Sequence, residues 1–200
     1  MVEEIDQAIP NKVRHQRNAI VIGDCIDMIP YVAAYDADVV RLRNIPEVRH
    51  FMNLTEPANT ESQSNWRAGY ESRENDIMWI IKDKSGRVCG TNRIYNISKE
   101  FCEKGSLIAD PILARTAPIT LESEVIAITT AFDKFNVLAI ITHVRPDNAK
   151  MNSINDRFGF FKDGEVDIRG EKYYRYTLPR SSWNPLKFKA ILSQWAKRFN

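Results

Sequence analysis

Apolar residues recur along the chain at spacings that predict alternating strands and helices. Short apolar runs bounded by turn residues predict strands over residues 19–24, 77–82, 88–97, 99–110 and 138–144, and two more within 160–178 that meet at Arg169 and Gly170. Apolar positions at helical spacing predict helices over residues 31–43, 47–52, 120–135 and 148–158, and one more that starts with Thr60 or Ser62 as its N-cap. The resulting order, β-α-α-βββ-α-β-α-ββ, predicts one α+β domain with a mixed sheet.

The two ends of the chain differ from this alternating pattern. Residues 1–17 mix charged and amide side chains around Pro10 and predict a loosely held leader, so that the domain itself spans residues 18–180. Residues 181–200 predict a basic amphipathic helix whose apolar side chains lie near one face: Leu186, Ile191, Leu192, Trp195 and Phe199. Such a helix can dock on its own domain, on a second subunit or on an anionic membrane. We favour packing on protein, which includes a homodimer through this helix.

Composition narrows the class of protein. The 200 residues contain 44% hydrophobic and 27% charged side chains, a balance typical of a globular domain. Because 28 Lys and Arg face 26 Asp and Glu, the charge gives no reason to expect a nucleic-acid partner. No apolar run approaches the roughly 20 residues of a membrane span, and the N-terminus lacks the pattern of a signal peptide. Three widely spaced cysteines predict neither a disulfide framework nor a zinc site. We therefore expect a cytoplasmic protein without a membrane partner.

Three stretches of the chain have a recognisable pattern: the hairpin 77–95, the segment 103–110 followed by Arg115 and Glu122, and the segment from His143 to Phe160. Together they resemble the GNAT family of acetyl-CoA-dependent N-acetyltransferases. The resemblance covers roughly residues 19–178 and implies a mixed central sheet flanked by helices. It is closest to the branch that acetylates ribosomal-protein N-termini and nucleotide-linked amino sugars, of which the segment 43–52 is typical.

The resemblance implies acetyl-CoA as co-substrate and no metal. A helix N-terminus can hold the pyrophosphate of acetyl-CoA, and the family does so with an Arg/Gln-x-x-Gly-x-Gly/Ala loop. Residues 115–120 occupy that place, but Pro118 and Thr120 replace the two glycines, and Pro118 removes an N–H donor. The alternative is a helix-capping loop without a ligand. The residues that the resemblance implies for the cofactor are Ile108, Ala109, Asp110, Arg115, Ile119, Thr120, Leu121 and Asn148, the last of which also suits a helix N-cap.

Glu103 is the candidate catalytic residue. It stands where several members of the branch carry a glutamate that draws a proton from the incoming amine, and partial burial of such a carboxylate would favour the role. The alternative is an exposed strand charge paired with Lys99 or Lys104. Many members also use a tyrosine as acid where this chain has Asn155. The three histidines, including His143, show no spacing that suggests a metal or a catalytic triad.

The acceptor amine is expected between the first two helices and the central hairpin. The residues implied there are Arg43, Asn44, Trp79, Arg93 and Tyr95; Arg93 suits a phosphate or carboxylate, whereas Trp79 suits the core equally well. The implied function is transfer of an acetyl group to a primary amine of a small molecule or peptide, such as an amino sugar or a protein N-terminus, by direct attack of the neutral amine. The alternative is a non-catalytic protein of the same fold with a binding or assembly role.

Overall fold

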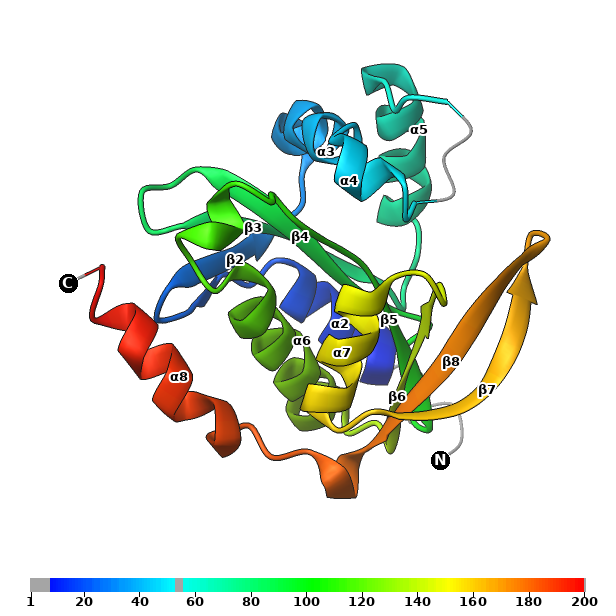
Figure 1. Cartoon of the computed structure of the whole chain (residues 1–200). Helices are drawn as coiled ribbons and strands as arrows, with labels where there is room; N and C mark the ends of the chain where they lie inside the picture. The colour runs from blue at the N-terminus through cyan, green and yellow to red at the C-terminus, as the bar shows by residue number, and fades with distance from the viewer. Residues whose placement is uncertain (1–7, 53–55, 200) are drawn as a thin grey trace.

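The computed structural model describes residues 8–52 and 56–199. At its centre, the described residues form an eight-stranded mixed sheet in the order β1-β2-β3-β4-β5-β6-β8-β7 (Figure 1). The strands are β1 (Val21–Ile22), β2 (Ile26–Pro30), β3 (Ile77–Asp83), β4 (Val88–Tyr95), β5 (Phe101–Ala109), β6 (Ala139–Val144), β7 (Phe161–Ile168) and β8 (Glu171–Pro179). The helices are α2 (Ala8–Arg17), α3 (Asp36–Arg43), α4 (Pro46–Arg49), α5 (Thr60–Glu71), α6 (Ile119–Phe135), α7 (Ala149–Phe158) and α8 (Leu186–Ala196), with short 3₁₀ turns η1 (Ala33–Tyr35), η2 (Leu113–Arg115) and η3 (Arg180–Ser182). A mixed sheet flanked by helices in a single domain confirms the predicted fold.

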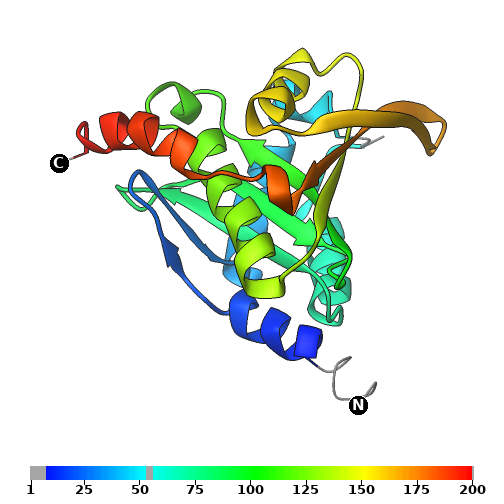
Figure 2. The ribbon, with the colours of Figure 1, turned by 90° about the horizontal axis from the view of Figure 1, so that it is seen from below.

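Helices cover both faces of the sheet (Figures 1 and 2). On one face, α6 and α2 pack over the larger apolar core, in which Trp79 and Ile128 are fully buried. On the other face, α3 and α5 cover a smaller core built on Tyr31, Val39, Tyr70, Met78 and Ile80. Because side chains alternate across a strand, the odd and even positions of β3 serve different cores.

The one parallel pair in the described sheet joins β5 and β6. These strands are in register only over 101–104 and 139–142, although β5 continues to Ala109 and β6 to Val144. A bulge lies in this unpaired part of β5, because three steps there match two steps of β4, and Ser106 takes a left-handed backbone with a φ of 50°. The two strands therefore separate at the place where β5 is bent.

The N-terminal part of the described chain differs from the expectation of a loosely held leader. Residues 8–17 form α2, whose Val13 is buried in the larger core, and Arg17 donates its Nε–H to the carbonyl oxygen of Asp76 at 3.1 Å. Residues 1–7 of the expected leader lie outside the described residues. The strand expected at 19–24 is reduced to β1, and β2 follows it unpredicted.

The N-cap of helix α5 is neither of the two expected residues, Thr60 and Ser62, but Asn59. The Asn59 side chain accepts the backbone N–H of Ser62 at 2.8 Å, and the Ser62 hydroxyl accepts the N–H of Asn59 at 3.2 Å. This reciprocal pair is a capping box, so Asn59 is the N-cap and Ser62 its N3 partner.

The C-terminal helix α8 docks on its own domain. Phe188 and Leu192 are buried, and the Phe188 ring stacks on Phe158 of α7 with ring centroids 4.4 Å apart. Leu186 and Ile191 stay exposed on the outer side of the helix. A homodimer through α8 stays a prediction. Among the described helices, none has the length and apolar character required to cross a bilayer.

Candidate active site

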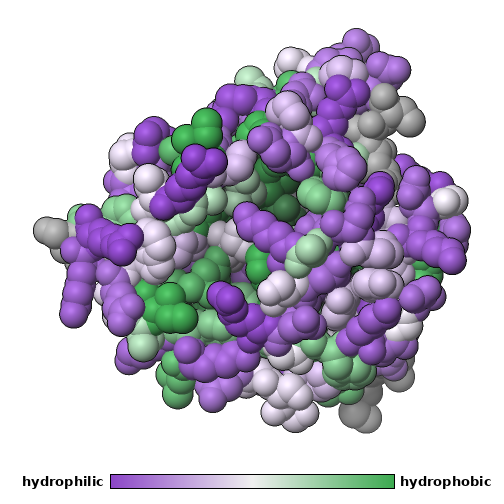
Figure 3. Space-filling model, in the orientation of Figure 1, coloured by the Kyte–Doolittle hydropathy of each residue, from purple (hydrophilic) through white to green (hydrophobic). Residues whose placement is uncertain are grey.

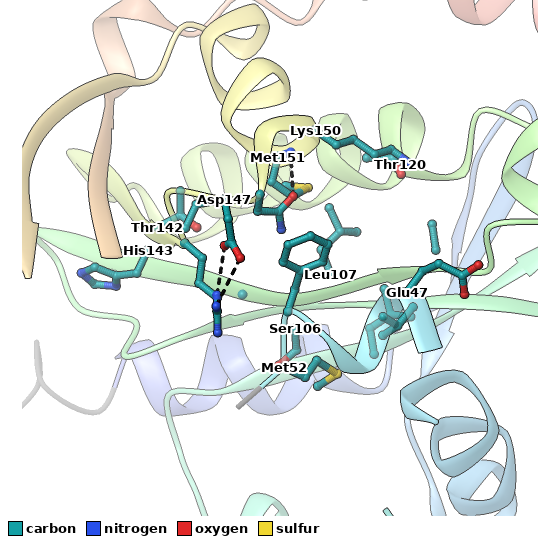
Figure 4. Close-up of a pocket in the computed structure, with 18 of the residues that line it drawn as sticks. Glu47, Met52, Ser106, Leu107, Thr120, Thr142, His143, Asp147, Lys150 and Met151 are labelled. Atoms are coloured by element: carbon teal, nitrogen blue, oxygen red, sulfur yellow. Dashed lines mark hydrogen bonds and ion pairs between the residues drawn. The ribbon is translucent and has the colours of Figure 1, made fainter. Parts of the chain in front are cut away.

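A pocket of about 580 Å³ opens where β5 and β6 separate. Its walls come from α4, from residues 104–109 of β5, from residues 142–145 of β6 and from the start of α7 at residues 147–151. In the surface view the hollow between α4 and α7 is apolar in its depth and polar at its rim (Figure 3). The close-up shows Ser106 and Leu107 of β5 below the start of α7, and Thr120 of α6 at one end (Figure 4).

The N-terminus of α6 reaches this pocket without a cap of its own. Pro118 is the N-cap residue and offers no side-chain cap, while the N–H of Glu122 bonds the Pro118 carbonyl oxygen at 2.9 Å. The N–H groups of Ile119, Thr120 and Leu121 precede the first bond of the helix, and helix ends of this kind attract anions. Thr120 lines the pocket, whereas Pro118 does not. The loss of a donor at Pro118 therefore leaves three first-turn N–H groups in place.

The carboxylate of the first turn of α6 is held away from the helix end. Glu122 accepts the backbone N–H groups of Asp24, Cys25 and Ile26 at 2.6, 2.8 and 2.8 Å. Burial raises the pKa of Glu122 above its usual range, although the three N–H groups oppose that shift. A side chain at Gly23 would collide with this carboxylate, since its Cβ would lie 2.8 Å from Oε1. Glu122 thus fastens the β1–β2 loop to α6.

The start of α7 forms the other rim of the pocket. The Asn148 side chain accepts the N–H of Met151 at 3.1 Å, so Asn148 caps α7 and lines the pocket at once. Lys150, an exposed cation that the sequence analysis did not single out, lies on the same side of the pocket as Thr120 (Figure 4). Arg145 and Asp147 bond each other at 3.0 Å, and Arg145 lowers the pKa of Asp147. Among the described residues, Lys150 is therefore the cation at this rim that forms no ion pair.

Four of the eight residues expected to hold acetyl-CoA line the pocket: Ile108, Ala109, Thr120 and Asn148. The other four lie off its wall. Asp110 accepts the N–H of Ile112 at 3.0 Å and forms an ion pair with Arg41. Ile119 is fully buried in the core, and Leu121 packs against that core. Arg115 is exposed at the end of η2.

Glu103 lies next to the pocket rather than on its wall. Its Oε1 accepts the Asn96 side-chain N–H at 2.8 Å, and its Oε2 lies 3.7 Å from Nδ1 of His143, which does line the pocket. Within the described part of the chain, the alternative partners Lys99 and Lys104 form no ion pair with Glu103, since Lys104 pairs with Glu124 instead. Burial lowers the pKa of His143, against the opposing charge of Glu103, so the imidazole is neutral near pH 7. The parallel pairing of β5 with β6 brings the two groups together, which no sequence spacing reveals.

A buried ion pair lies behind the pocket wall. Lys104 of β5 and Glu124 of α6 are 2.6 Å apart with side chains 2% and 0% exposed, and Asn92 donates its Nδ2–H to Glu124 at 3.1 Å. Asn155 on α7 is also fully buried, and neither polar atom of its side chain has a partner among the described residues. Asn155 carries no acidic proton, so α7 offers no general acid at this position.

The residues expected at the acceptor separate into two sets. Arg43, Arg93 and Tyr95 lie under α5, since Arg93 contacts the rings of Trp66 and Tyr95 at 5.2 and 4.3 Å and Arg43 lies 5.5 Å from Trp66. Burial and then the charge of Glu103 raise the pKa of Tyr95 to about 12. Asn44 instead bonds both backbone groups of Ala58, and Trp79 is fully buried in the core under α6. Trp79 therefore takes the core position that the sequence left open.

None of the three cysteines is poised as a nucleophile. Cys25, Cys89 and Cys102 are free and buried, and burial raises the pKa of each thiol to about 12. Because the thiolate is the reactive form of cysteine, these side chains offer no covalent route for group transfer near pH 7.

Comparison with known proteins places this geometry in a family. The sequence model for the acetyltransferase (GNAT) domain matches residues 28–161. A GCN5-related N-acetyltransferase from Brucella melitensis superposes with a TM-score of 0.72 at 18% identity, covering 90% of this chain and 86% of that one. Apo FdhC, a nucleotide-linked sugar GNAT, gives 0.73 at 19% identity, with coverage of 90% and 99%.

RimJ from Mycobacterium smegmatis, in complex with CoA-disulfide, gives a TM-score of 0.70 at 14% identity, with coverage of 83% of this chain and 88% of that one. None of the curated protein sequences matches this chain significantly. At these identities the superpositions show the fold alone, whereas the match to the domain model shows common ancestry. The chain belongs to the GNAT family of acetyltransferases.

Proposed function

We propose that the protein is an acetyl-CoA-dependent N-acetyltransferase that acts on a primary amine. The observation that carries this proposal is the pocket between β5 and β6, which ends at the uncapped N-terminus of α6. A long apolar slot with an anion-attracting helix end suits a pantetheine arm joined to a pyrophosphate. RimJ, which shares the fold, holds a CoA derivative.

The residues present fit acetyl-CoA despite the missing glycines. The first-turn N–H groups of α6 and the ammonium of Lys150 would hold the pyrophosphate, with Arg115 as a further cation near η2. Ile108, Ala109 and Asn148 would flank the pantetheine arm. Asp110, Ile119 and Leu121 would act from behind this wall, by fixing the loop and the start of α6.

Acetyl-CoA supplies an activated acetyl thioester: the amide C–N bond forms as the C–S bond breaks, the amine loses one proton and the sulfur gains one. The neutral imidazole of His143 is the pocket group able to accept the amine proton, and Glu103 would stabilise the resulting imidazolium. The role expected of Glu103 is thereby shared with His143. The acceptor remains a primary amine of a small molecule or peptide, approached from the face covered by α3 and α5, and the protein would work in the cytoplasm.

Calorimetry with acetyl-CoA tests the proposal. We expect a dissociation constant in the micromolar range, and Thr120→Glu should weaken binding because a carboxylate at the helix end opposes the pyrophosphate. Ser153→Glu, on the exposed side of α7, adds the same charge away from the pocket and should leave binding unchanged. Binding weaker than millimolar would instead favour a non-catalytic binding or assembly protein of this fold.

A further inference from the structure

Arg43, the last residue of α3, is a half-buried cation without an anionic partner among the described residues. Its Nε is inaccessible to solvent and makes no hydrogen bond, and no carboxylate lies within ion-pair distance of its guanidinium. Burial lowers the pKa of Arg43, and the charge of Arg93 acts in the same direction. The group that compensates it in part is the Trp66 ring, 5.5 Å from the guanidinium carbon.

The neighbouring arginines are already engaged. Arg93 bonds both carboxylate oxygens of Asp76, at 2.8 and 2.5 Å, and Arg73 contacts the same carboxylate at 3.1 Å. Arg67 bonds Asp36 and Glu71. One carboxylate, Asp76, thus serves two guanidiniums, and Arg43 adds a third cation near Trp66 with no carboxylate to match it. The surface under α5 therefore carries an excess of positive charge.

Withdrawing part of a guanidinium from water without a counter-charge is unfavourable, and an anion bound beside it offsets that cost. A guanidinium matches an oxyanion in particular, because its planar fork donates two parallel hydrogen bonds to a carboxylate or phosphate. We propose that Arg43 binds an oxyanionic group, carboxylate or phosphate, carried by the acceptor amine. This inference rests on the proposed acetyltransferase function and specifies its substrate class.

Arg43 lies where it could bind the anionic end of an acceptor whose amine reaches the pocket. Arg43 and Arg93 share the Trp66 ring, Arg93 covers Tyr95, and Tyr95 pairs across the sheet with Glu103, which lies 3.7 Å from His143 on the pocket wall. An acceptor held at Arg43 by its anion therefore has its amine directed along this row toward the pocket. The same excess of guanidiniums opposes a polyamine, which brings only positive charge.

The role that the sequence analysis gave to Arg93 thus moves to Arg43. Arg93 has the right chemistry for a phosphate or carboxylate, but Asp76 already occupies its fork. Displacing Asp76 from Arg93 would leave a carboxylate that is 1% exposed with only the more exposed Arg73 as its ionic partner, so the free site is at Arg43.

Matched pairs of acceptors test this assignment. Initial rates are compared for glucosamine 6-phosphate against glucosamine and for glycine against glycinamide, with wild type and Arg43→Gln. We expect wild type to favour the anionic member of one pair in kcat/KM, mainly through KM, and Arg43→Gln to reduce that preference about ten- to a hundredfold. The preference of wild type is divided by that of Arg43→Gln, and this ratio cancels differences in the intrinsic reactivity of the amines. The pair that responds distinguishes phosphate from carboxylate.

A binding measurement separates this inference from the proposed function. In protein saturated with CoA, inorganic phosphate and acetate are titrated by calorimetry into wild type, Arg43→Gln and Arg43→Lys. Anion binding that weakens in both variants supports the inference even if no acetyl transfer is detected. Arg14→Gln, an equal charge change on exposed α2, is the control and should behave as wild type.

Two results overturn the inference. One is an acceptor preference and an anion affinity that are the same in wild type, Arg43→Lys and Arg43→Gln, with thermal melting showing all three folded. The other is faster turnover of spermidine than of either anionic acceptor. Failure of CoA itself to bind is a different result, because it contradicts the proposed function. The inference about Arg43 is then tested by the anion titration of wild type and the two variants without CoA.

Discussion

At the scale of single residues, the fold brings the Glu103 carboxylate, which lies beside the pocket, close to the imidazole of His143 on the pocket wall, although the two are forty positions apart in sequence. Glu103 is anchored by Asn96, which fixes its Oε1 and leaves Oε2 toward His143. A carboxylate 3.7 Å from the ring favours its protonated form through its charge. The pair would thus suit the proton transfer that the proposed function requires.

Glu103→Gln should reduce kcat/KM for the acceptor by about 10²- to 10⁴-fold, the range expected when general-base catalysis is lost. The affinity for acetyl-CoA measured by calorimetry should stay unchanged, because Glu103 lies off the pocket wall. Glu165→Gln, on the exposed β7, removes the same charge elsewhere and should keep full activity. Unaltered turnover of Glu103→Gln across the pH range would remove this residue from the mechanism.

The pH profile identifies the group that accepts the proton. An amine acceptor must be neutral to attack, so log kcat/KM rises with slope one below the pKa of the amine. Burial places the pKa of His143 below its usual 6.5, and below that lowered pKa the imidazole is protonated, so the slope should steepen to two. His143→Gln should lower the rate and keep slope one throughout. A steep limb that survives in His143→Gln would assign the base to another group.

Resemblance to a family points to some of these residues and misses others for physical reasons. Glu103 stands at a position with a recognised role, and Asn148 in a loop of typical pattern. His143 carries no local signal, because its importance arises from parallel pairing between distant strands. Likewise, Arg93 and Arg43 carry the same guanidinium group, so the sequence does not distinguish them. Only the position of Asp76 in the fold determines that Arg93 has a carboxylate partner and Arg43 has none among the described residues.

At the scale of elements, the Lys104–Glu124 pair ties β5 to α6 directly behind the pocket. Neither side chain reaches solvent, so each charge depends on the other for its stability. Asn92 of β4 donates to the same carboxylate, which makes three elements meet at one point. This part of the wall is therefore held together by contacts from β4, β5 and α6.

Lys104→Met should lower the free energy of unfolding by about 3–5 kcal/mol, because it leaves the Glu124 carboxylate buried without its cation. The double variant Lys104→Met/Glu124→Leu should recover much of that loss. Lys162→Met, which breaks the exposed contact with Glu165 at 3.3 Å, should matter far less, since exposed ion pairs contribute about 0–1 kcal/mol. Urea denaturation followed by circular dichroism measures all three. A single variant as stable as wild type would contradict the argument.

Helices and strands with a regular apolar pattern can be predicted from the sequence, whereas those that depend on contacts with distant parts of the chain cannot. The hairpin β3–β4, helix α6 and helix α7 with Gly159 at its end all agree with their apolar patterns. Strand β2 contains Asp27 and Pro30 and gains its definition from pairing with β3, and α2 depends on Val13 meeting a distant core. At the bulge that shapes the pocket, the left-handed backbone falls on Ser106 rather than on the neighbouring Gly105, and the register with β4 that defines the bulge is a long-range contact.

At the scale of the whole molecule, α8 closes the far side of the larger core. The Phe158 ring stacks on Phe188 and lies parallel to Trp183 with centroids 6.0 Å apart, so α7 rests on the C-terminal segment. The start of α7 forms the rim of the pocket. The C-terminal segment thus packs against α7, whose first residues form the rim of the pocket.

Phe188→Ala should therefore cost about 3–5 kcal/mol of stability, the usual loss for a buried phenylalanine. Leu186→Ala removes an apolar side chain from the same helix where it is 71% exposed and should change little. Thermal unfolding monitored by calorimetry compares the two. Equal melting temperatures for both variants would mean that α8 is not part of the cooperative unit.

The bonds from residues 24–26 to Glu122 also bear on how the chain folds as it is made. They span 96 to 98 positions, so the β1–β2 loop leaves the ribosome long before the carboxylate that fastens it. Strand β2 can pair with β3 earlier, but β1 stays at an open edge, where Ile20 and Ile22 are exposed even in the finished fold. Contacts this distant form slowly, because a long loop must close first. The loop that carries this edge therefore stays unfastened in a nascent chain until α6 has been synthesised, which adds to the exposure of the edge while the chain is being made.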